Sequence, residues 1–385
     1  MYVSVSYECL EMVGTMARMD VMLVVGARPQ FIKSAPLIRE ILSRHRQIRL
    51  SIVHSGQHYD PEMSDIFFRE LRMPEPMVNL QAGSGSHAEQ TATIMKRLEG
   101  PMIKAKPDVV IVPGDTNTTL AAALTAAKLN IPVAHLEAGL RSGDMTMPEE
   151  INRRLTDHCS ALLFAPTQTA VCNLKREGLS NASWLTGDTM VDALHIAMPQ
   201  VRAKERAFLE QFRLRPHQYV LVTLHRPSNV DNHGRFRQIL IALDRLSKRL
   251  PVIFPVHPRT LKRLDKLGLR KSSTQTGVII TRPQGYIETL GLLHNASSLL
   301  TDSGGMQKEA FLLRVPCITL RSNTEWPETL EGGANQLLVN PEMIPSMAMR
   351  VASDEKLRDR IGRIANPFGN GHSSAKIAHL LRMTF

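Results

Sequence analysis

The feature that most constrains the fold is a regular alternation of short apolar segments with longer helical stretches. The apolar segments occupy residues 21–25, 50–54, 108–113, 131–136, 161–165, 218–224, 251–256, 277–280, 296–302 and 315–320, and we expect the last of these to be the final strand. Strands that alternate with helices form parallel sheets covered on both faces. A chain of 385 residues is long enough for two such units. We therefore predict an α/β protein with two doubly wound sheets in tandem.

Charged residues follow the predicted strand at 131–136. Glu137 and Arg141 come directly after it, and Glu149 stands beyond a short loop, in the first turn of a helix that Pro148 opens. Ligands of open α/β sheets bind at the carboxyl ends of the strands, so these residues are candidates for a binding site. A salt bridge and an acid at a helix N-terminus would explain the same residues without a ligand.

Other strand ends in the first half also carry polar residues. Arg28 and Lys33 add cations near the start of a helix, where the helix dipole favours an anion, although surface charges would look the same. Asp115 follows the third strand, although an acid there commonly caps the next helix. Gln57 and His58 lie in the loop after the second strand, so we expect them on the same edge of the sheet.

The second half contains a better phosphate site. Ser303-Gly304-Gly305 stands between a strand and a helix, and two glycines would let a ligand approach the backbone N–H groups of the helix N-terminus. Glu309, one turn further on, could accept hydrogen bonds from ribose hydroxyls. His225 and His257 each follow a strand and could face a diphosphate, although either alone is more often structural. Together these residues favour a nucleotide diphosphate.

Composition excludes several classes of protein. The cysteines, Cys9, Cys159, Cys172 and Cys317, have no paired spacing, which argues against a disulfide framework and a zinc site and suits the cytoplasm. The formal net charge is +11, but no basic run is interleaved with aromatic residues, so we expect no nucleic-acid partner. No apolar run approaches the roughly 20 residues that span a bilayer, and the N-terminus lacks a signal-peptide pattern, so we expect no membrane association.

A set of motifs in this chain resembles the non-hydrolysing UDP-N-acetylglucosamine 2-epimerase family. The motifs occur in the family's order and are Gly26-Ala-Arg-Pro-Gln-Phe-Ile-Lys33, Gly114-Asp-Thr, His135-Leu-Glu-Ala-Gly-Leu-Arg141, Pro148-Glu-Glu-Ile-Asn-Arg153, His225-Arg, Pro255-Val-His-Pro and Thr301-Asp-Ser-Gly-Gly with Glu309. The resemblance implies a GT-B-like fold of two Rossmann-like domains facing one cleft, at residues 20–195 and 196–367, with residues 368–385 crossing back to the first. It also implies a homodimer, no metal and no cofactor.

The resemblance further implies roles for individual residues. Asp115, Glu137 and Glu149 match the family's catalytic acids, and His225 is expected to act beside them on the diphosphate side. The residues that match substrate-binding positions are Arg28, Lys33, Gln284, Ser303, Gly304, Gly305 and Glu309. Gln57 and His58 fall in the loop that matches the family's site for a second UDP-sugar as activator, and Arg226 is a further candidate for that site.

Two departures from the family pattern leave the substrate open. Trp326 stands where many members have an arginine, and the loop at 142–147 is short. Both features resemble branches that act on oxidised or di-N-acetylated UDP-sugars, so a UDP-sugar of the diacetamido uronic acid type is the second candidate substrate. Three different activities also stay open: a hydrolysing epimerase that releases N-acetylmannosamine and UDP, a sugar transferase of the same fold, and a protein that only binds UDP-sugars or nucleic acid.

Overall fold

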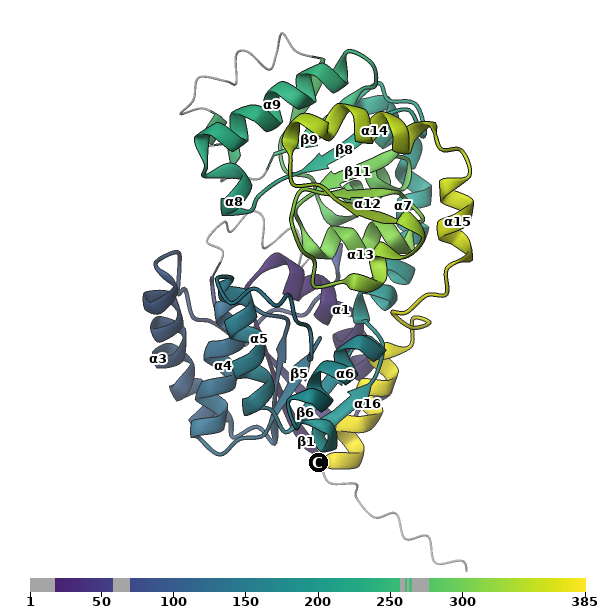
Figure 1. Ribbon diagram of the computed structural model, residues 1–385. Coiled ribbons are helices and arrows are strands. Elements are labelled where there is room, and N and C mark those ends of the chain that lie inside the picture. The colour runs from purple at the N-terminus through teal and green to yellow at the C-terminus, as the bar shows by residue number, and fades with distance from the viewer. Residues whose placement is uncertain (1–17, 58–69, 257–259, 262, 265–276) are drawn as a thin grey trace, which may run out of the picture.

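The structure, a computed structural model, describes residues 18–57, 70–256, 260–261, 263–264 and 277–385. These residues form two lobes, each built on one sheet with helices on both faces (Figure 1). The described strands have the order β3-β2-β1-β4-β5-β6-β7 in the first sheet and β10-β9-β8-β11-β12-β13 in the second. Neighbouring strands are parallel throughout both sheets. The predicted pair of doubly wound sheets is therefore confirmed.

The first sheet is buried on both faces. Its strands are β1 (Met19–Val25), β2 (Ile48–His54), β3 (Val78–Asn79), β4 (Val109–Pro113), β5 (Val133–Leu136), β6 (Leu162–Ala165) and β7 (Ser183–Leu185). Its helices include α1 (Arg28–Arg44), α3 (His87–Ala105), α4 (Asn117–Lys128), α5 (Pro148–Cys159) and α6 (Gln168–Arg176). Val21 and Leu23 pack in a core with α1, whereas Met22 and Val24 pack with α3 and α4. Because alternate residues of a strand point to opposite faces, a continuous apolar run suits a strand covered on both sides.

The second sheet is also buried on both faces. Its strands are β8 (Val220–Thr223), β9 (Val252–Pro255), β10 (Val278–Thr281), β11 (Ser298–Thr301), β12 (Cys317–Thr319) and β13 (Asn335–Leu337). The helices around it include α8 (Pro227–Val230), α9 (His233–Ser247), α12 (Tyr286–His294), α13 (Gly304–Leu312), α14 (Ile344–Ser353) and α15 (Leu357–Arg363), together with the 3-10 segment η2 (Pro327–Gly333). Val220 and Val222 pack with α9 and α14, and Leu221 packs on the other face with α12 and α13.

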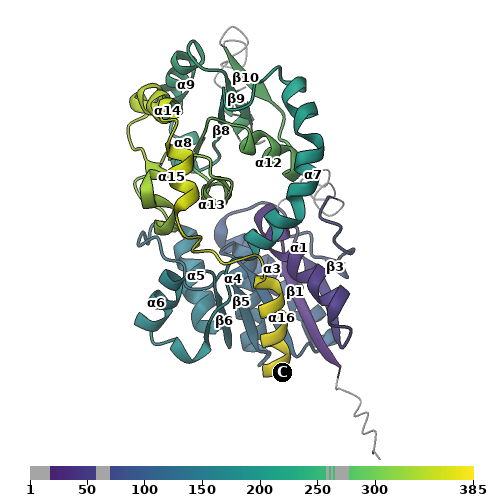
Figure 2. The ribbon, with the colours of Figure 1, turned by 90° about the vertical axis from the view of Figure 1, so that its right-hand side faces the viewer.

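Two helices tie distant parts of the chain together. The helix α7 (Thr189–Gln211) starts in the first lobe, where Met190 packs in the core beside α1, and ends in the second, where Leu209 packs beside α12 (Figure 2). The last helix, α16 (Ser373–Thr384), returns to the first lobe and buries Ile377 there. The carboxylate of Asp192 on α7 accepts a hydrogen bond from the backbone nitrogen of Ser374 at 2.7 Å, which fastens the start of α16 to α7.

The structure corrects some details of the sequence prediction. The segment at 315–320 is not the final strand, because β13 pairs with β12 beyond it. The sequence pattern also does not predict β3, α14 or α15. The domain boundary at 195–196 stays a prediction, and these two residues lie in the helix α7, which runs from one lobe to the other. A helix expected around residues 61–67 lies outside the described residues. In the part of the chain that the structure describes, every helix is too short or too polar to cross a membrane.

Candidate active site

Glu137 directly follows β5, at the edge where the strands of the first sheet end. Its backbone has a left-handed φ of 72°, and its side chain is only 6% exposed. Lys33, in the second turn of α1, donates a hydrogen bond to one carboxylate oxygen. Lys308, on α13 of the other lobe, donates to the second oxygen at 2.7 Å. The surroundings of Glu137 are therefore assembled from both lobes.

The two lysines decide the charge of Glu137. Burial acts to raise the pKa of this carboxyl group, but the charges and hydrogen bonds of Lys308 and Lys33 outweigh burial and hold the pKa at about 2. Glu137 is therefore an anion at neutral pH. If either lysine turned to another anion, the pKa of Glu137 would rise and the carboxylate would become a stronger base.

Arg141 and His135 have structural roles around the same strand. The Arg141 guanidinium lies 2.8 Å from the carboxylate of Asp157, so Arg141 does form a salt bridge, with an acid that the sequence does not single out. His135 is fully buried, with Nδ1 2.7 Å from Asp157 and Nε2 2.7 Å from the carbonyl oxygen of Gly114. The imidazole thus joins β5 to the turn after β4, and this turn carries Asp115.

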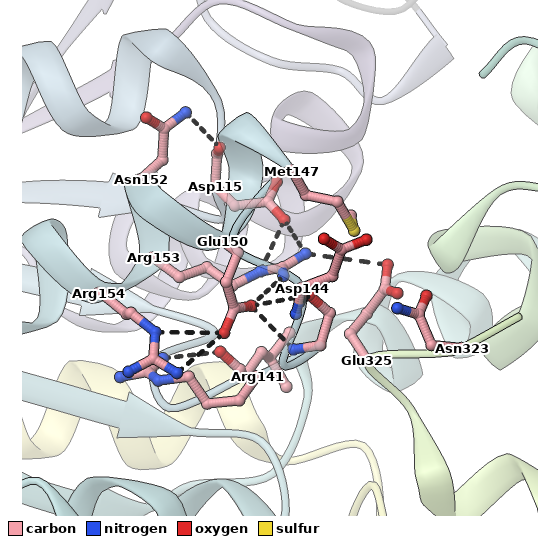
Figure 3. A network of polar contacts seen from close by, with 12 residues as sticks. Asp115, Arg141, Asp144, Met147, Glu150, Asn152, Arg153, Arg154, Asn323 and Glu325 are labelled. Carbon is pink, nitrogen blue, oxygen red and sulfur yellow. Dashed lines mark hydrogen bonds and ion pairs between the residues drawn. The ribbon is translucent and has the colours of Figure 1, made fainter. Parts of the chain in front are cut away.

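Asp115 does not cap α4, because the hydroxyl of Thr116 accepts the capping hydrogen bond instead. Asp115 accepts two hydrogen bonds from Arg153, at 3.0 Å from Nε and 2.6 Å from Nη2 (Figure 3). Arg153 is 2% exposed and also lies 3.0 Å from Glu150 and 3.9 Å from Glu325. Asp115 of the first lobe and Glu325 of the second therefore share one buried guanidinium group.

The two adjacent acids at the start of α5 differ in their surroundings. Glu150 is fully buried, accepts a hydrogen bond from the backbone nitrogen of Ser142 at 2.8 Å and pairs with Arg153. Burial acts to raise the pKa of Glu150, but these two partners outweigh burial and lower it. Glu149 is partly exposed, and the described part of the structure records no hydrogen bond or ion pair for its side chain. Glu150 thus holds the loop at 142–147 through Ser142.

The predicted phosphate cradle forms the start of α13. Ser303 is the N-cap residue but makes no capping hydrogen bond through its side chain, and the helix begins at Gly304. A Cβ atom at Gly304 would clash with the carboxylate of Glu325, whereas one at Gly305 would meet only Ser303 Oγ, at 4.0 Å. Gly304 therefore makes room for an acid of the protein itself, and Gly305 leaves the open approach that the sequence predicts for a ligand.

Three arginines surround the carboxylate of Glu325. Arg321 lies 2.6 Å away, Arg226 lies 3.4 Å away and Arg153 lies 3.9 Å away. Burial acts to raise the pKa of Glu325, but the three guanidinium groups outweigh burial and hold the pKa at about 2. Arg226 also donates from Nε to the carbonyl oxygen of Asp302 at 2.9 Å. This candidate activator residue therefore belongs to the cluster around Glu325.

Glu309 is a buried acid whose pKa lies near neutrality. Its exposed fraction is 4%, and burial raises its pKa to about 7, against the opposing effects of Arg28, Lys308 and a hydrogen bond with Tyr286. Arg28 is the first residue of α1, where the sequence predicts an anion, and it interacts electrostatically with Glu309 from the other lobe. The N-terminus of α1 thus faces the acid that the sequence assigns to a ribose.

His225 and Gln284 lie at strand ends of the second sheet. The His225 side chain is 45% exposed, and its Nδ1 lies 3.2 Å from Oδ1 of the buried Asp302. The side-chain amide of Gln284 donates within its own turn, at 2.7 Å to the carbonyl oxygen of Arg282. His257 lies outside the described residues. His225 is thus oriented by an acid and still accessible, whereas Gln284 contacts its own loop.

The proposed activator residues do not form one group in the described part of the chain. The carbonyl oxygen of the Gln57 side chain accepts a hydrogen bond from Thr118 Oγ1 at 2.6 Å, at the start of α4. Arg226 contacts Glu325 instead, and His58 lies outside the described residues. The structure therefore gives the loop of Gln57 a contact with the start of α4.

The sequence pattern assigns no role to three residues that the structure places at this site. Lys308, Arg153 and Asp188 are each at most 3% exposed, and each forms an ion pair. Lys308 stands next to Glu309 on its helix, and Arg153 is the last residue of one of the family motifs, so the sequence does mark both positions. Asp188 resembles an ordinary helix cap, and it is indeed the N-cap of α7.

Comparisons with known proteins agree on one family. The model of the UDP-N-acetylglucosamine 2-epimerase family matches residues 40–382. The UDP-N-acetylglucosamine 2-epimerase of Methanocaldococcus jannaschii is 45% identical over 94% of this chain and 99% of its own length. Its crystal structure in complex with UDP-GlcNAc and UDP superposes with a TM-score of 0.86, over 95% of this chain and all of that one. The UDP-2,3-diacetamido-2,3-dideoxy-D-glucuronate 2-epimerase of Pseudomonas aeruginosa is 40% identical over 94% of this chain and 99% of its own length.

Proposed function

The chain belongs to the UDP-N-acetylglucosamine 2-epimerase family, and from that premise we propose that it inverts carbon 2 of a UDP-linked N-acetylhexosamine, interconverting UDP-GlcNAc and UDP-ManNAc. The observation that carries the proposal is the position of Glu137, a buried carboxylate held between Lys33 and Lys308 where the two lobes meet. A carboxylate with adjacent cations is suited to moving a proton beside a departing anion.

The chemistry explains why both kinds of charge are needed. The proton on carbon 2 of the sugar is not acidic, because no carbonyl group adjoins that carbon. A base can remove this proton if the bond from carbon 1 to UDP breaks as well, which leaves a 2-acetamido glycal and free UDP. Return of a proton to the opposite face, with UDP re-adding to carbon 1, completes the inversion. The protein must therefore supply acid and base groups near carbon 2 and cations for the departing diphosphate.

In this proposal the first lobe handles the sugar. Glu137, Asp115 and Glu149 are the acid and base candidates, and Lys33 and Arg28 bind the diphosphate at the N-terminus of α1. When the diphosphate draws Lys33 away, Glu137 keeps Lys308 alone, and its pKa rises toward that of a useful base. Substrate binding would thus activate the carboxylate.

The second lobe is proposed to hold UDP. Ser303-Gly304-Gly305 at the start of α13 offers backbone N–H groups to a phosphate, and Glu309 accepts hydrogen bonds from the ribose hydroxyls. His225 is proposed to act on the diphosphate side, since it is exposed and oriented by Asp302. Gln284 would reach the nucleotide by exchanging the hydrogen bond within its own turn for one to the ligand.

Incubation with UDP-GlcNAc in deuterated water tests the proposal. Proton NMR should show loss of the carbon-2 proton signal and the appearance of UDP-ManNAc. Absence of exchange with every UDP-N-acetylhexosamine offered would refute it. Free N-acetylmannosamine and UDP as the sole products would identify a hydrolysing epimerase instead.

The Pseudomonas relative supports a second candidate substrate. Its 40% identity over nearly the whole chain makes a UDP-linked diacetamido glucuronate a reasonable candidate for this chain too. The same exchange experiment on both sugars decides between them, because the ratio of the two kcat/KM values measures the preference directly.

We also propose that the protein is a cytoplasmic homodimer that supplies activated N-acetylmannosamine for a surface polysaccharide, and that a second UDP-sugar activates it. Only the family resemblance supports these points. Light scattering would give the oligomeric state, and exchange rates at increasing UDP-GlcNAc would show activation as a sigmoidal dependence. Sugar-nucleotide profiles of cells lacking the protein would test the pathway and the location.

A further inference from the structure

Lys308 is a buried cation to which the proposed function assigns no contact with the substrate. Lys308 is fully buried on α13, and its ammonium group has three partners. Nζ lies 2.7 Å from Glu137 Oε1, 2.5 Å from Asp188 Oδ2 and 3.9 Å from the centre of the Trp326 ring. A lysine is seldom buried unless it is paired, so this position has a specific use.

The partners of Lys308 come from different parts of the molecule. Glu137 follows β5 in the first lobe, and Trp326 immediately precedes η2 in the second. Asp188 is the N-cap of α7, and its other oxygen accepts a hydrogen bond from the backbone nitrogen of Met190 at 2.8 Å. The carboxylate that begins the helix connecting the lobes therefore also holds the lysine that reaches Glu137.

The charged neighbours leave Lys308 permanently protonated. Burial acts to lower the pKa of its ammonium group, but Asp188 and Glu137 outweigh burial and raise it. Lys33 faces the same carboxylate of Glu137 from α1, and Glu309 lies in the next position of α13. Two lysines contact Glu137. Lys33 lies in the second turn of α1, the helix whose N-terminus is proposed to bind the diphosphate. Lys308 is instead held in place by Asp188 and Trp326.

We propose that Lys308 is a positioning residue for the epimerisation: it keeps the Glu137 carboxylate in place at the sugar after Lys33 has turned to the diphosphate. Because Lys308 belongs to the second lobe and Glu137 to the first, this hold exists only while the lobes are together. Asp188 and Trp326 fix the ammonium group so that it can act in this way. This inference rests on the proposed function.

The test compares the wild type with Lys308→Met/Asp188→Asn. The double variant removes one positive and one negative charge together, so neither partner is left as an unpaired buried ion. Asparagine caps a helix about as well as aspartate, so α7 should still form. Lys175→Met, at an exposed position of α6, is the control for loss of a lysine without this contact. The measurements are kcat, KM for UDP-GlcNAc and the pH profile of kcat/KM from carbon-2 proton exchange.

We expect kcat of the double variant to fall about 10- to 100-fold, because the carboxylate is no longer held at the reacting carbon. KM should change by less than about threefold, since Lys308 has no role in binding UDP. The acid limb of kcat/KM should move up by about one pH unit or more, because Glu137 has lost a cation. Lys308→Arg, which keeps the charge, should recover part of kcat.

A folded double variant with the kcat and acid limb of the wild type would overturn the inference. If the double variant does not fold, the single variant Asp188→Asn tests the inference. It keeps the helix cap but removes the ion pair between Asp188 and Lys308, so kcat should fall about threefold or more. An unchanged kcat in that variant would overturn the inference as well. An inactive wild type would instead refute the proposed function, so the two failures are distinguishable.

Discussion

Replacing Glu309 by glutamine should stabilise the protein at alkaline pH while weakening its binding of UDP. Glu309 is buried between the lobes, and its pKa is raised from 4.5 to about 7. A carboxyl group whose pKa is higher in the folded than in the unfolded chain binds its proton more tightly when folded. The free energy of unfolding is therefore greatest below the unfolded pKa and falls as the pH rises through the folded pKa.

The size of this effect follows from the difference between the two pKa values. A rise of about 2.5 units corresponds to about 3 kcal/mol of unfolding free energy lost between pH 4.5 and pH 8. The amide of Glu309→Gln has a similar shape and does not ionise, so the variant avoids this loss. Because the ribose would lose a hydrogen bond to a charged acceptor, the affinity for UDP should fall by about 10- to 100-fold.

Urea unfolding at pH 5 and at pH 8 measures the first effect, with the fluorescence of the buried Trp326 as the signal from the second lobe. The two proteins should have similar stability at pH 5, and the variant should be more stable by about 3 kcal/mol at pH 8. Glu149→Gln, at a partly exposed acid for whose side chain the described structure records no hydrogen bond or ion pair, is the matched control for the substitution itself. A Glu309→Gln variant whose stability relative to the wild type is the same at both pH values would refute the reasoning. Calorimetry with UDP measures the second effect.

Three further predictions concern the same site. Glu137→Gln should slow carbon-2 exchange by about 10²- to 10⁴-fold while calorimetry still detects UDP binding, and wild-type exchange in this variant would contradict the role of that acid. Gly304→Ala should lower the midpoint of urea unfolding by an amount equivalent to about 1–3 kcal/mol, because the added methyl group meets the Glu325 carboxylate, and an unchanged midpoint would show that this contact gives way freely. Because the pKa of Glu325 is lowered to about 2, the stability that this carboxylate contributes is present above pH 4.5 and is lost as the pH falls to 2. Circular dichroism should therefore show a shallower acid transition for Glu325→Gln than for the wild type. The same transition in both proteins would count against the pairing of Glu325 with the arginines.

The sequence predicts the sheets well because buried parallel strands are continuous apolar runs, such as Val109–Pro113 and the strand before Glu137. It fails for β13, whose three residues include Asn335 and Gln336 and present no apolar run. Short edge strands of this kind are specified by their neighbour, here β12, and not by their own composition.

The sequence predicts those site residues that stand at the end of a strand or at the start of a helix. Glu137, Arg28 and Ser303-Gly304-Gly305 all stand at such positions, and local sequence marks them. Lys308 and Glu325 are different, because their importance depends on which residues of the other lobe they meet. No pattern along the chain records a contact between positions 137 and 308, so only the folded structure reveals it.

The unbroken course of α7 between the lobes limits how this chain can change in length. Each residue of an α-helix adds 1.5 Å of rise and about 100° of rotation. A single insertion or deletion between Asp188 and Leu209 would therefore turn one lobe around the other and point Lys308 away from Glu137. Relatives of this protein are expected to vary in length in their surface loops and to keep this segment constant, and a library of random one-residue insertions should lose activity throughout it.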